Sequence, residues 1–222
     1  MDEQMNALKT NHQLEIQIEE LITEFDVIPD ERKEQLVELS DFIAKIKLVH
    51  HSVAITIIRT HNSRRSQIGQ LWVMAAAQYY GFADIHSHSG GMEATTFNSK
   101  AVAAMQRAGF KIKQVLKEDN PIYEATIGKG HPSIKMFSKK YDHLVNPSRN
   151  FIAIMVCSEA DAACPFVPGA MLRVSLPFDD PKIADGTAHE KIAYDEAVRI
   201  IGREVLYTFH LAKKKWVAEL LE

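Results

Sequence analysis

Hydrophobic residues recur every three or four positions over the first part of the chain, which is the spacing of an amphipathic helix. They form two sets, which are Leu14, Ile18, Leu21, Ile22 and Phe25, and then Leu36, Leu39, Phe42, Ile43 and Ile46. Pro29 separates the sets and is followed by Asp30 and Glu31, a favourable helix start because acidic side chains suit the first turn. The pattern predicts a helical extension over residues 1–50, before a main domain over residues 51–222. The extension would either cap the chain's own core or pair two chains into a homodimer.

An apolar run begins the main domain and stops abruptly at a polar loop. Residues 53–58 are rich in β-branched side chains, as in a buried parallel strand, and residues 67–80 return to helical spacing. The loop between them, residues 59–66, reads RTHNSRRS and holds three arginines. Backbone N–H groups at a helix N-terminus point into such a loop, the helix dipole favours negative charge, and an arginine adds a two-pronged donor. The sequence therefore predicts an anion-binding loop at this junction.

The rest of the chain alternates between strand and helix signals. The expected elements, in order, are a strand that holds His86 and His88, a helix over residues 98–108, a β-hairpin over residues 121–141, a strand over residues 150–156 and a long helix over residues 188–209. This order predicts an α/β fold, a three-layer sandwich with a central parallel sheet, helices on both faces and a ligand at the carboxyl ends of the strands. The hairpin would be either a lid beside the anion-binding loop or an added sheet edge. Lys129 and His131 at its tip are candidate anion contacts.

Composition and charge narrow the function classes. With 222 residues, 46% of them hydrophobic, and a net charge of −3, the chain has the core of a globular domain and no electrostatic case for binding nucleic acid or a membrane surface. No apolar run approaches the roughly 20 residues of a membrane span, and the first residues lack the apolar centre of a signal peptide, so a cytoplasmic location is expected. The two cysteines, Cys157 and Cys164, are then either buried thiols or redox groups.

Histidines raise the question of a metal site. His86 and His88 alternate on the second expected strand, and His61 in the polar loop would have to join them, since imidazole suits zinc or copper. No further side chain at ligand spacing completes a set. We therefore expect neither a metal nor a cofactor, and we interpret these histidines as hydrogen-bonded or solvated.

The polar loop resembles the signature of the low-molecular-weight protein tyrosine phosphatases and the thioredoxin-coupled arsenate reductases, which share one fold. That signature is a cysteine, five residues, an arginine, and Ser or Thr, directly after the first strand. The resemblance places Arg59 where the family carries its nucleophilic cysteine. It implies that Arg65 binds the oxyanion and that Ser66 occupies the position that hydrogen-bonds the thiolate in relatives. The anion-binding residues that it implies are Thr60, His61, Asn62, Ser63, Arg64 and Arg65.

Three later segments extend this resemblance over residues 53–210. A turn of the form Ser-x-Gly-x-Glu-Ala follows the second strand, at residues 89–94. Cys157 and Cys164 end a strand seven positions apart, as in the arsenate reductases, where the first attacks the oxidised nucleophile and the second resolves the disulfide. In the segment FDDP, Asp180 is implied as the general acid, with Asp179 as the second choice, although an acidic loop that only caps the next helix would look the same.

The substitution at residue 59 leaves two classes of function open. A phosphatase or reductase needs a thiolate nucleophile, and an arginine cannot replace it because it stays protonated in proteins. We therefore expect a phosphatase-like or arsenate reductase-like protein that is inactive, whose ligand is phosphate, arsenate or sulfate and whose partner would be thioredoxin. The alternatives are a non-catalytic oxyanion-binding or interaction module, and an active protein in which Arg59 is a strain or cloning variant of cysteine. The cysteine pair favours reductase over phosphatase ancestry.

Overall fold

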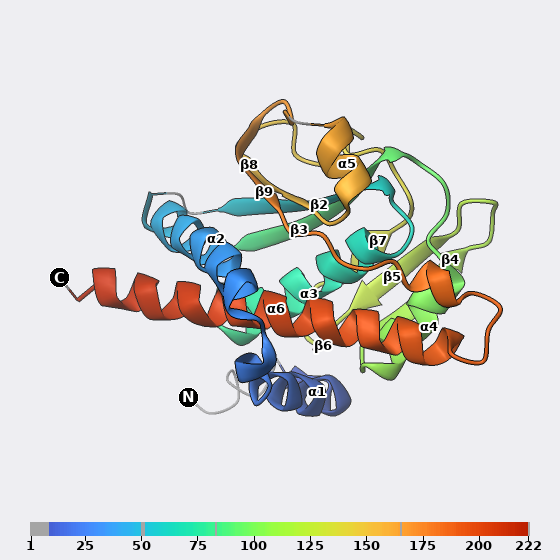
Figure 1. The fold of residues 1–222 in the computed structure, drawn as a ribbon, viewed down its shortest axis with the longest axis horizontal. Coiled ribbons are helices and arrows are strands. Elements are labelled where there is room, and N and C mark those ends of the chain that lie inside the picture. The colour runs from blue at the N-terminus through green and yellow to red at the C-terminus, as the bar shows by residue number, and fades with distance from the viewer. Residues whose placement is uncertain (1–8, 50–51, 83, 165, 222) are drawn as a thin grey trace.

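The computed structural model describes residues 9–49, 52–82, 84–164 and 166–221. Four parallel strands form the central sheet in the order β3-β2-β8-β9 (Figure 1). Their bounds are Val53–His61 for β2, Ile85–Glu93 for β3, Phe151–Met155 for β8 and Ala170–Ser175 for β9. The predicted α/β class with a central parallel sheet is confirmed. The last strand, β9, was not predicted.

Side chains of the two central strands alternate between two cores. Ile55 and Ile57 of β2 face the larger core, whereas Ile58 faces a smaller cluster that contains Cys157 and Ala160. The larger core lies under α3 (Arg65–Tyr79) and α6 (Glu190–Glu219), and the smaller one lies under α5 (Ser158–Ala163). Helices therefore cover both faces of the sheet, as Figure 1 shows with α5 on the side opposite to α3 and α6. Of these helices, α5 was not predicted.

The N-terminal extension packs on this domain through α6. It consists of α1 (His12–Ile22), the short 3-10 helix η1 (Phe25–Val27) and α2 (Asp30–Val49), and both α1 and α2 contact α6. Seven of the apolar side chains that indicated the two helices are buried in the larger core: Leu14, Ile18, Leu21, Leu36, Leu39, Ile43 and Ile46. The extension thus shares one core with the main domain. A homodimer through residues 1–50 stays a prediction.

The segment between β3 and β8 adds an antiparallel sheet to the domain. After α4 (Ser99–Arg107), strands β4 (Lys111–Leu116), β5 (Ile122–Thr126) and β7 (Ile134–Met136) pair in the order β4-β5-β7. The predicted hairpin is the β5-β7 pair. Between its strands, β6 (Gly128–Lys129) pairs with β1 (Lys9–Thr10), so the hairpin tip contacts the N-terminal segment. Neither β4 nor β1 was predicted.

Two boundaries expected from the sequence differ in the structure, namely the end of β2 and the end of β3. Strand β2 continues to His61, so Arg59 is a strand residue and the turn itself spans only residues 62–64. The expected turn at residues 89–94 is mostly strand, because Gly91 pairs with Arg59 and Glu93 pairs with His61. Gly91 permits this close approach, since a Cβ there would lie 2.6 Å from the backbone nitrogen of Asn62.

Within the described ranges, no helix is long and apolar enough to cross a membrane.

Candidate anion site at the carboxyl ends of the strands

Three arginines gather where β2 leads into α3. Arg59 lies near the end of β2, Arg64 precedes α3, and Arg65 is its first residue. All three side chains are buried, with exposed fractions of 4%, 9% and 5% for the whole residues. Such burial of three positive charges is costly unless each charge is compensated. The site therefore needs a negative group.

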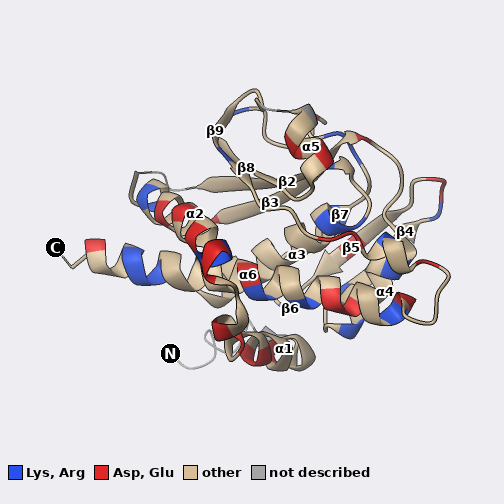
Figure 2. Ribbon diagram, in the orientation of Figure 1, with Lys and Arg blue, Asp and Glu red and all other residues tan. Residues whose placement is uncertain are grey.

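Asp180 supplies that negative group from a loop more than one hundred residues away in sequence. Its Oδ2 lies 3.1 Å from Arg59 Nη2 and 2.8 Å from Arg65 Nη2, and its Oδ1 lies 2.8 Å from Arg64 Nε. Figure 2 shows the basic residues at the start of α3 beside the acidic loop that leads into α6. One carboxylate facing three guanidinium groups leaves the cluster with two net positive charges.

The arginines hold Asp180 in its charged form. Burial alone would raise the pKa of Asp180, but the hydrogen bond from Arg64, the charge of Arg65 and the backbone N–H of Lys182 outweigh burial and lower the pKa to about 2. Burial also lowers the pKa of Arg59, and the neighbouring charge of Arg65 lowers it further. A general acid must carry a proton at the working pH. In this arrangement Asp180 is a carboxylate near neutral pH and has no proton to donate.

The loop that carries Asp180 is fastened at several points. Asp180 Oδ1 accepts the Lys182 N–H at 3.1 Å, which caps the short 3-10 helix η2 (Pro181–Ala184). Arg65 donates to the carbonyl of Phe178. From α2, Arg32 donates to the carbonyl of Pro177 at 3.1 Å and lies 4.8 Å above the Phe178 ring. Asp180 thus both caps a helix and reaches the arginines.

Asp179, the second choice for the acidic role, is exposed and makes no ion pair among the described residues. It belongs instead to the rim of a groove behind the loop. Of the two neighbouring aspartates, the geometry therefore selects Asp180 as the one that faces the arginines.

Part of the arginine cluster remains unsatisfied. Within the described ranges, Arg59 Nε, Arg59 Nη1 and Arg65 Nε are buried and have no hydrogen-bond partner. Most buried donors in proteins are paired, and an unpaired one costs about 1–3 kcal/mol. Two carboxylate oxygens are too few acceptors for three guanidinium groups. The cluster therefore has spare capacity for an acceptor-rich anion.

Asn62 fixes the shape of the turn between β2 and α3. Its Nδ2 donates to Ser66 Oγ at 2.9 Å, and its Oδ1 accepts from Gln67 Nε2 and from the Lys139 backbone N–H, both at 3.1 Å. Ser66 is fully buried, and its hydroxyl accepts this hydrogen bond from Asn62. Both predicted residues thus shape the turn, and neither contacts Asp180.

The other predicted anion-site residues lie around this turn in different environments. The carbonyl of Ser63 accepts the N–H of Asn98, the N-cap of α4. His61 is partly exposed, and its Nε2 lies 3.5 Å from a carboxylate oxygen of Glu93. Thr60 Oγ1 lies 3.5 Å from Cys157 Sγ. These residues surround the turn rather than converge on one point.

Sequence reasoning missed three residues that support the site, namely Arg32, Gln67 and Lys139. Arg32 and Lys139 reach the site from distant segments, and no local pattern marks such contacts. Gln67 lies beside the apolar positions of the expected helix, and a fully buried glutamine needs internal partners. Gln67 finds them in Asn62 and in the carbonyl of Phe137.

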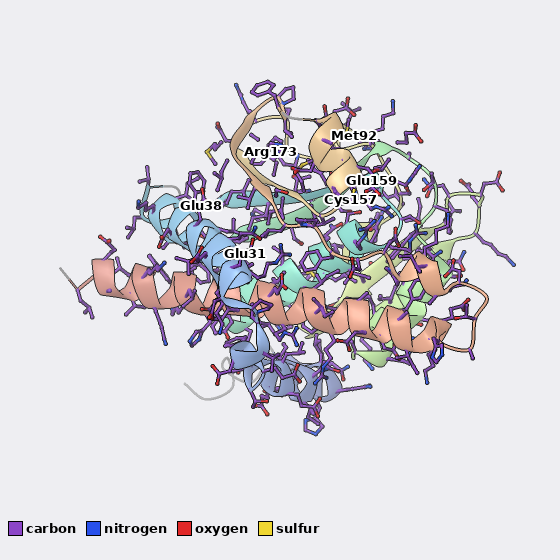
Figure 3. The ribbon with its side chains drawn as sticks, in the orientation of Figure 1. Glu31, Glu38, Met92, Cys157, Glu159 and Arg173 are labelled. Carbon is purple, nitrogen blue, oxygen red and sulfur yellow. The ribbon has the colours of Figure 1, made fainter. Side chains whose placement is uncertain are left out.

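Cys157 and Cys164 are both buried free thiols at opposite ends of α5. Figure 3 shows Cys157 and Glu159 together at the start of this helix. A hydrogen bond to its own backbone N–H, with smaller effects of Cys157, Arg65 and Arg59, lowers the pKa of Glu159. At a rise of about 1.5 Å per residue, Cys157 and Cys164 lie roughly 10 Å apart along the axis of α5. A bond between them therefore requires α5 to unwind.

Of the three histidines considered as metal ligands, His61 lies far from the other two. His86 pairs with Ala54 in the sheet register, whereas His61 pairs with Glu93, so His61 lies seven residues further along β2, which is roughly 23 Å. His86 and His88 instead line a cavity of about 320 Å³ with His131. Burial, helped by the charge of Lys139, lowers the pKa of His88 to about 4. In the part of the chain that the structure describes, no group of three metal-binding side chains is placed to hold an ion.

The tip of the β5-β7 hairpin lies at the same cavity. His131 lies there beside the first residues of β2 and β3, whereas the arginines lie beyond the other end of these strands. The expectation that Lys129 and His131 contact an anion in the loop is therefore wrong, because the tip folds toward the opposite end of the sheet. The residues after β7 approach the site instead, through Phe137 and Lys139.

Comparison with curated proteins finds relatives that are named arsenate reductases. The protein from Bacillus subtilis (strain 168) is 31% identical over 145 residues, which cover 65% of this chain and 86% of the relative. The protein from Halalkalibacterium halodurans is 29% identical over 145 residues, with the same coverage of both chains. No protein-family profile matches the chain. The sequence similarity thus extends over most of each relative's length.

Comparison with solved structures finds matches at lower identity. A low molecular weight protein tyrosine phosphatase from Bacillus subtilis has a TM-score of 0.49 at 12% identity, over 73% of this chain and 98% of that chain. An arsenate reductase from Archaeoglobus fulgidus has a TM-score of 0.42 at 14% identity, over 68% of this chain and 98% of that chain.

Proposed function

Because the chain belongs to the arsenate reductase family, within the superfamily that includes the low-molecular-weight protein tyrosine phosphatases, we propose that it is a non-catalytic member that binds tetrahedral oxyanions. The observation that carries this proposal is the buried Arg59 guanidinium, which lies near the end of β2 and shares Asp180 with Arg64 and Arg65. The resemblance in the loop sequence assigns that strand position to the nucleophile.

The absence of catalysis follows from the chemistry of arginine. Covalent phosphoryl transfer and arsenate reduction both begin with attack by a thiolate on the oxyanion. A guanidinium remains protonated and offers no lone pair for that attack. Cys157 does not replace the missing group in its present place, because its sulfur contacts Thr60 Oγ1 and it lies within the smaller core. Resequencing the source gene would test the alternative that Arg59 is a variant of an active protein.

Anion binding follows from the charge and the spare donors of the cluster. Two net positive charges remain after Asp180 is counted, and three buried arginine N–H groups have no partner within the described ranges. Arginine binds phosphate-like anions through parallel N–H donors, and a low-dielectric site strengthens that attraction. Phosphate, arsenate and sulfate therefore form the proposed ligand class.

Phosphate is expected to stabilise the wild-type protein against heat, and Arg65→Ala is expected to abolish that stabilisation. Arg65 supplies both an ion pair and a spare donor to the cluster, so its removal weakens the site. Thermal unfolding with increasing phosphate measures the effect, with saturation at 100 times Kd adding about 2.7 kcal/mol. Arg107→Ala is the matched control, since Arg107 forms an exposed ion pair with Asp195 outside the site. Equal phosphate responses of the two variants, or none in the wild type, would contradict the proposed function.

The cysteine pair is expected to retain a redox response that thioredoxin can reverse, which also fits the proposed cytoplasmic location. The helix between Cys157 and Cys164 has only six residues, and so short a helix is marginal without tertiary support. Treatment with diamide should therefore unwind α5 and close an intramolecular disulfide, whose Cα atoms must approach to roughly 4.4–6.8 Å. Mass spectrometry after thiol labelling checks this, with Cys164→Ser as the control. Two free thiols after oxidation would show that the pair is only structural.

A further inference from the structure

Asp180 lies among the three arginines, in the place where an external anion would be held. We propose that Asp180 is an internal competitor that sets the specificity of the site: tetrahedral dianions displace it from Arg59, Arg64 and Arg65, and monoanions do not. This inference rests on the proposed oxyanion-binding function, and it names both the ligand class and the residue that selects it.

The hydrogen-bond geometry favours a ligand with more than two oxygens. The two oxygens of Asp180 accept four arginine contacts, from Arg59 Nη2, Arg64 Nε, Arg64 Nη2 and Arg65 Nη2, at 2.8–3.2 Å. They leave three buried N–H donors of Arg59 and Arg65 without partners in the described ranges. Sulfate or phosphate has four acceptor oxygens, arranged in three dimensions instead of one plane. Exchange of Asp180 for such an anion therefore satisfies donors that the closed site leaves unpaired.

The charge balance also favours dianions over monoanions. A monoanion that displaces Asp180 brings the same charge that it replaces, so the exchange gains no Coulomb energy. The loop meanwhile loses the ion pairs between Asp180 and the arginines. A dianion reduces the net charge of the three arginines from the present two to one. Because the cluster is buried, this difference is weakly screened. Nitrate and formate should therefore be rejected, and sulfate, hydrogen phosphate and hydrogen arsenate accepted.

The loop around Asp180 has room to move away from the arginines. Residues 177 and 179 are exposed, and Ile183 in η2 is 87% exposed. An open groove of about 830 Å³ lies behind the loop, lined from α6 by Ala197 and Ile200 among others. Other polar contacts that hold the loop include those of Arg32 and Arg65 with the carbonyls of Pro177 and Phe178, and the Phe178 N–H donates to the Val156 carbonyl at 3.3 Å. Displacement thus breaks a small set of polar contacts and leaves the sheet intact.

Isothermal titration of the full chain with sulfate and with nitrate tests the inference. The wild type should bind sulfate and not nitrate. Asp180→Asn should bind sulfate about 10-fold more tightly or better and should also begin to bind nitrate, because the competitor has lost its charge. Asp179→Asn is the matched control and should behave as the wild type. Phe178→Ala, which leaves all four charged side chains in place but removes the ring under Arg32, should tighten sulfate binding in the same direction if Asp180→Asn does not fold.

The outcomes separate the inference from the proposed function. If the wild type and the variants bind sulfate with equal affinity and all reject nitrate, the site is an oxyanion site and Asp180 does not compete for it. Weaker sulfate binding by Asp180→Asn, or nitrate binding by the wild type, would equally overturn the role of Asp180. If neither the wild type nor any variant binds sulfate or phosphate, the proposed function itself fails. A gain by Asp180→Asn in both sulfate affinity and nitrate binding supports the inference.

Discussion

Arg59→Cys is expected to hydrolyse aryl phosphates, whereas the wild type is expected to show no turnover. Removing a catalytic nucleophile can cost about 10⁶-fold in rate, so restoring one should raise turnover at least about 100-fold above the wild type. The introduced thiol would sit near the end of β2 close to Arg64 and Arg65, whose positive charges favour the thiolate. Aryl phosphate hydrolysis by purified protein, with Arg59→Ser as the control that binds anions but lacks a thiol, measures the effect.

The same variant offers a second readout with arsenate. Thr60 Oγ1 lies 3.5 Å from the Cys157 sulfur, but residue 59 points to the opposite face of β2, so Cys157 would reach the introduced thiol only if α5 unwinds. Attack of the introduced thiol on arsenate would form a sulfur–arsenic bond with loss of water. Attack of Cys157 on that same sulfur would break this bond, form one disulfide and release arsenite. Two thiols are then oxidised for each arsenate reduced, and mass spectrometry should show an arsenate-dependent loss of two thiols. If Arg59→Cys binds phosphate yet acts on neither substrate, the loss of activity involves more than this residue, and the binding-module interpretation gains support.

The parts of the fold that depend on local pattern could be predicted from sequence. The apolar sets of α1 and α2 indicated helices because each helix buries one stripe, and the β-branched run of β2 indicated a strand because it is buried on both faces. The junction of β2 with α3 was recognisable because its arginines follow an apolar strand directly. These signals depend only on neighbours in the chain.

The missed elements lack such patterns. Strand β4 has a mostly exposed sequence, β9 is half-buried along most of its length, and α5 is too short to show a helical period. The hairpin was found, but the position of its tip was not, because the pairing of β6 with β1 joins segments more than one hundred residues apart. Tertiary pairing decided these cases.

The candidate site likewise combines features that local sequence predicts with features that only tertiary contacts determine. The arginines are close together in sequence, and the resemblance suggested Asp180 as a general acid. Its actual state depends on the path of the loop that Arg32 and Arg65 hold, which places the carboxylate among three guanidinium groups. In such a field a carboxyl stays ionised. A motif therefore located the residue, and only the three-dimensional arrangement shows its charge state.

Asp180→Asn is expected to lower the free energy of unfolding by about 2 kcal/mol near neutral pH in a buffer of low anion content. Folding lowers the pKa of Asp180 from 3.8 to about 2, and each pKa unit corresponds to about 1.4 kcal/mol of stability in the ionised state. The substitution removes that charge and leaves three buried guanidinium groups without their shared counterion. Urea unfolding of both proteins at a series of pH values measures the difference.

The sign of the pH dependence follows from the lowered pKa. A carboxyl with a lowered pKa contributes stability that is complete above its unfolded pKa, here near 4, and is lost as the pH falls through its folded pKa of about 2. The difference between wild type and Asp180→Asn should therefore be constant above about pH 5 and should shrink below about pH 4, where Asp180 begins to gain a proton in the unfolded chain. Asp179→Asn, on the exposed side of the loop, should change neither quantity. A difference that stays constant down to about pH 2 would show that the variant loses stability through shape and hydrogen bonding, and that the charge of Asp180 does not stabilise the cluster.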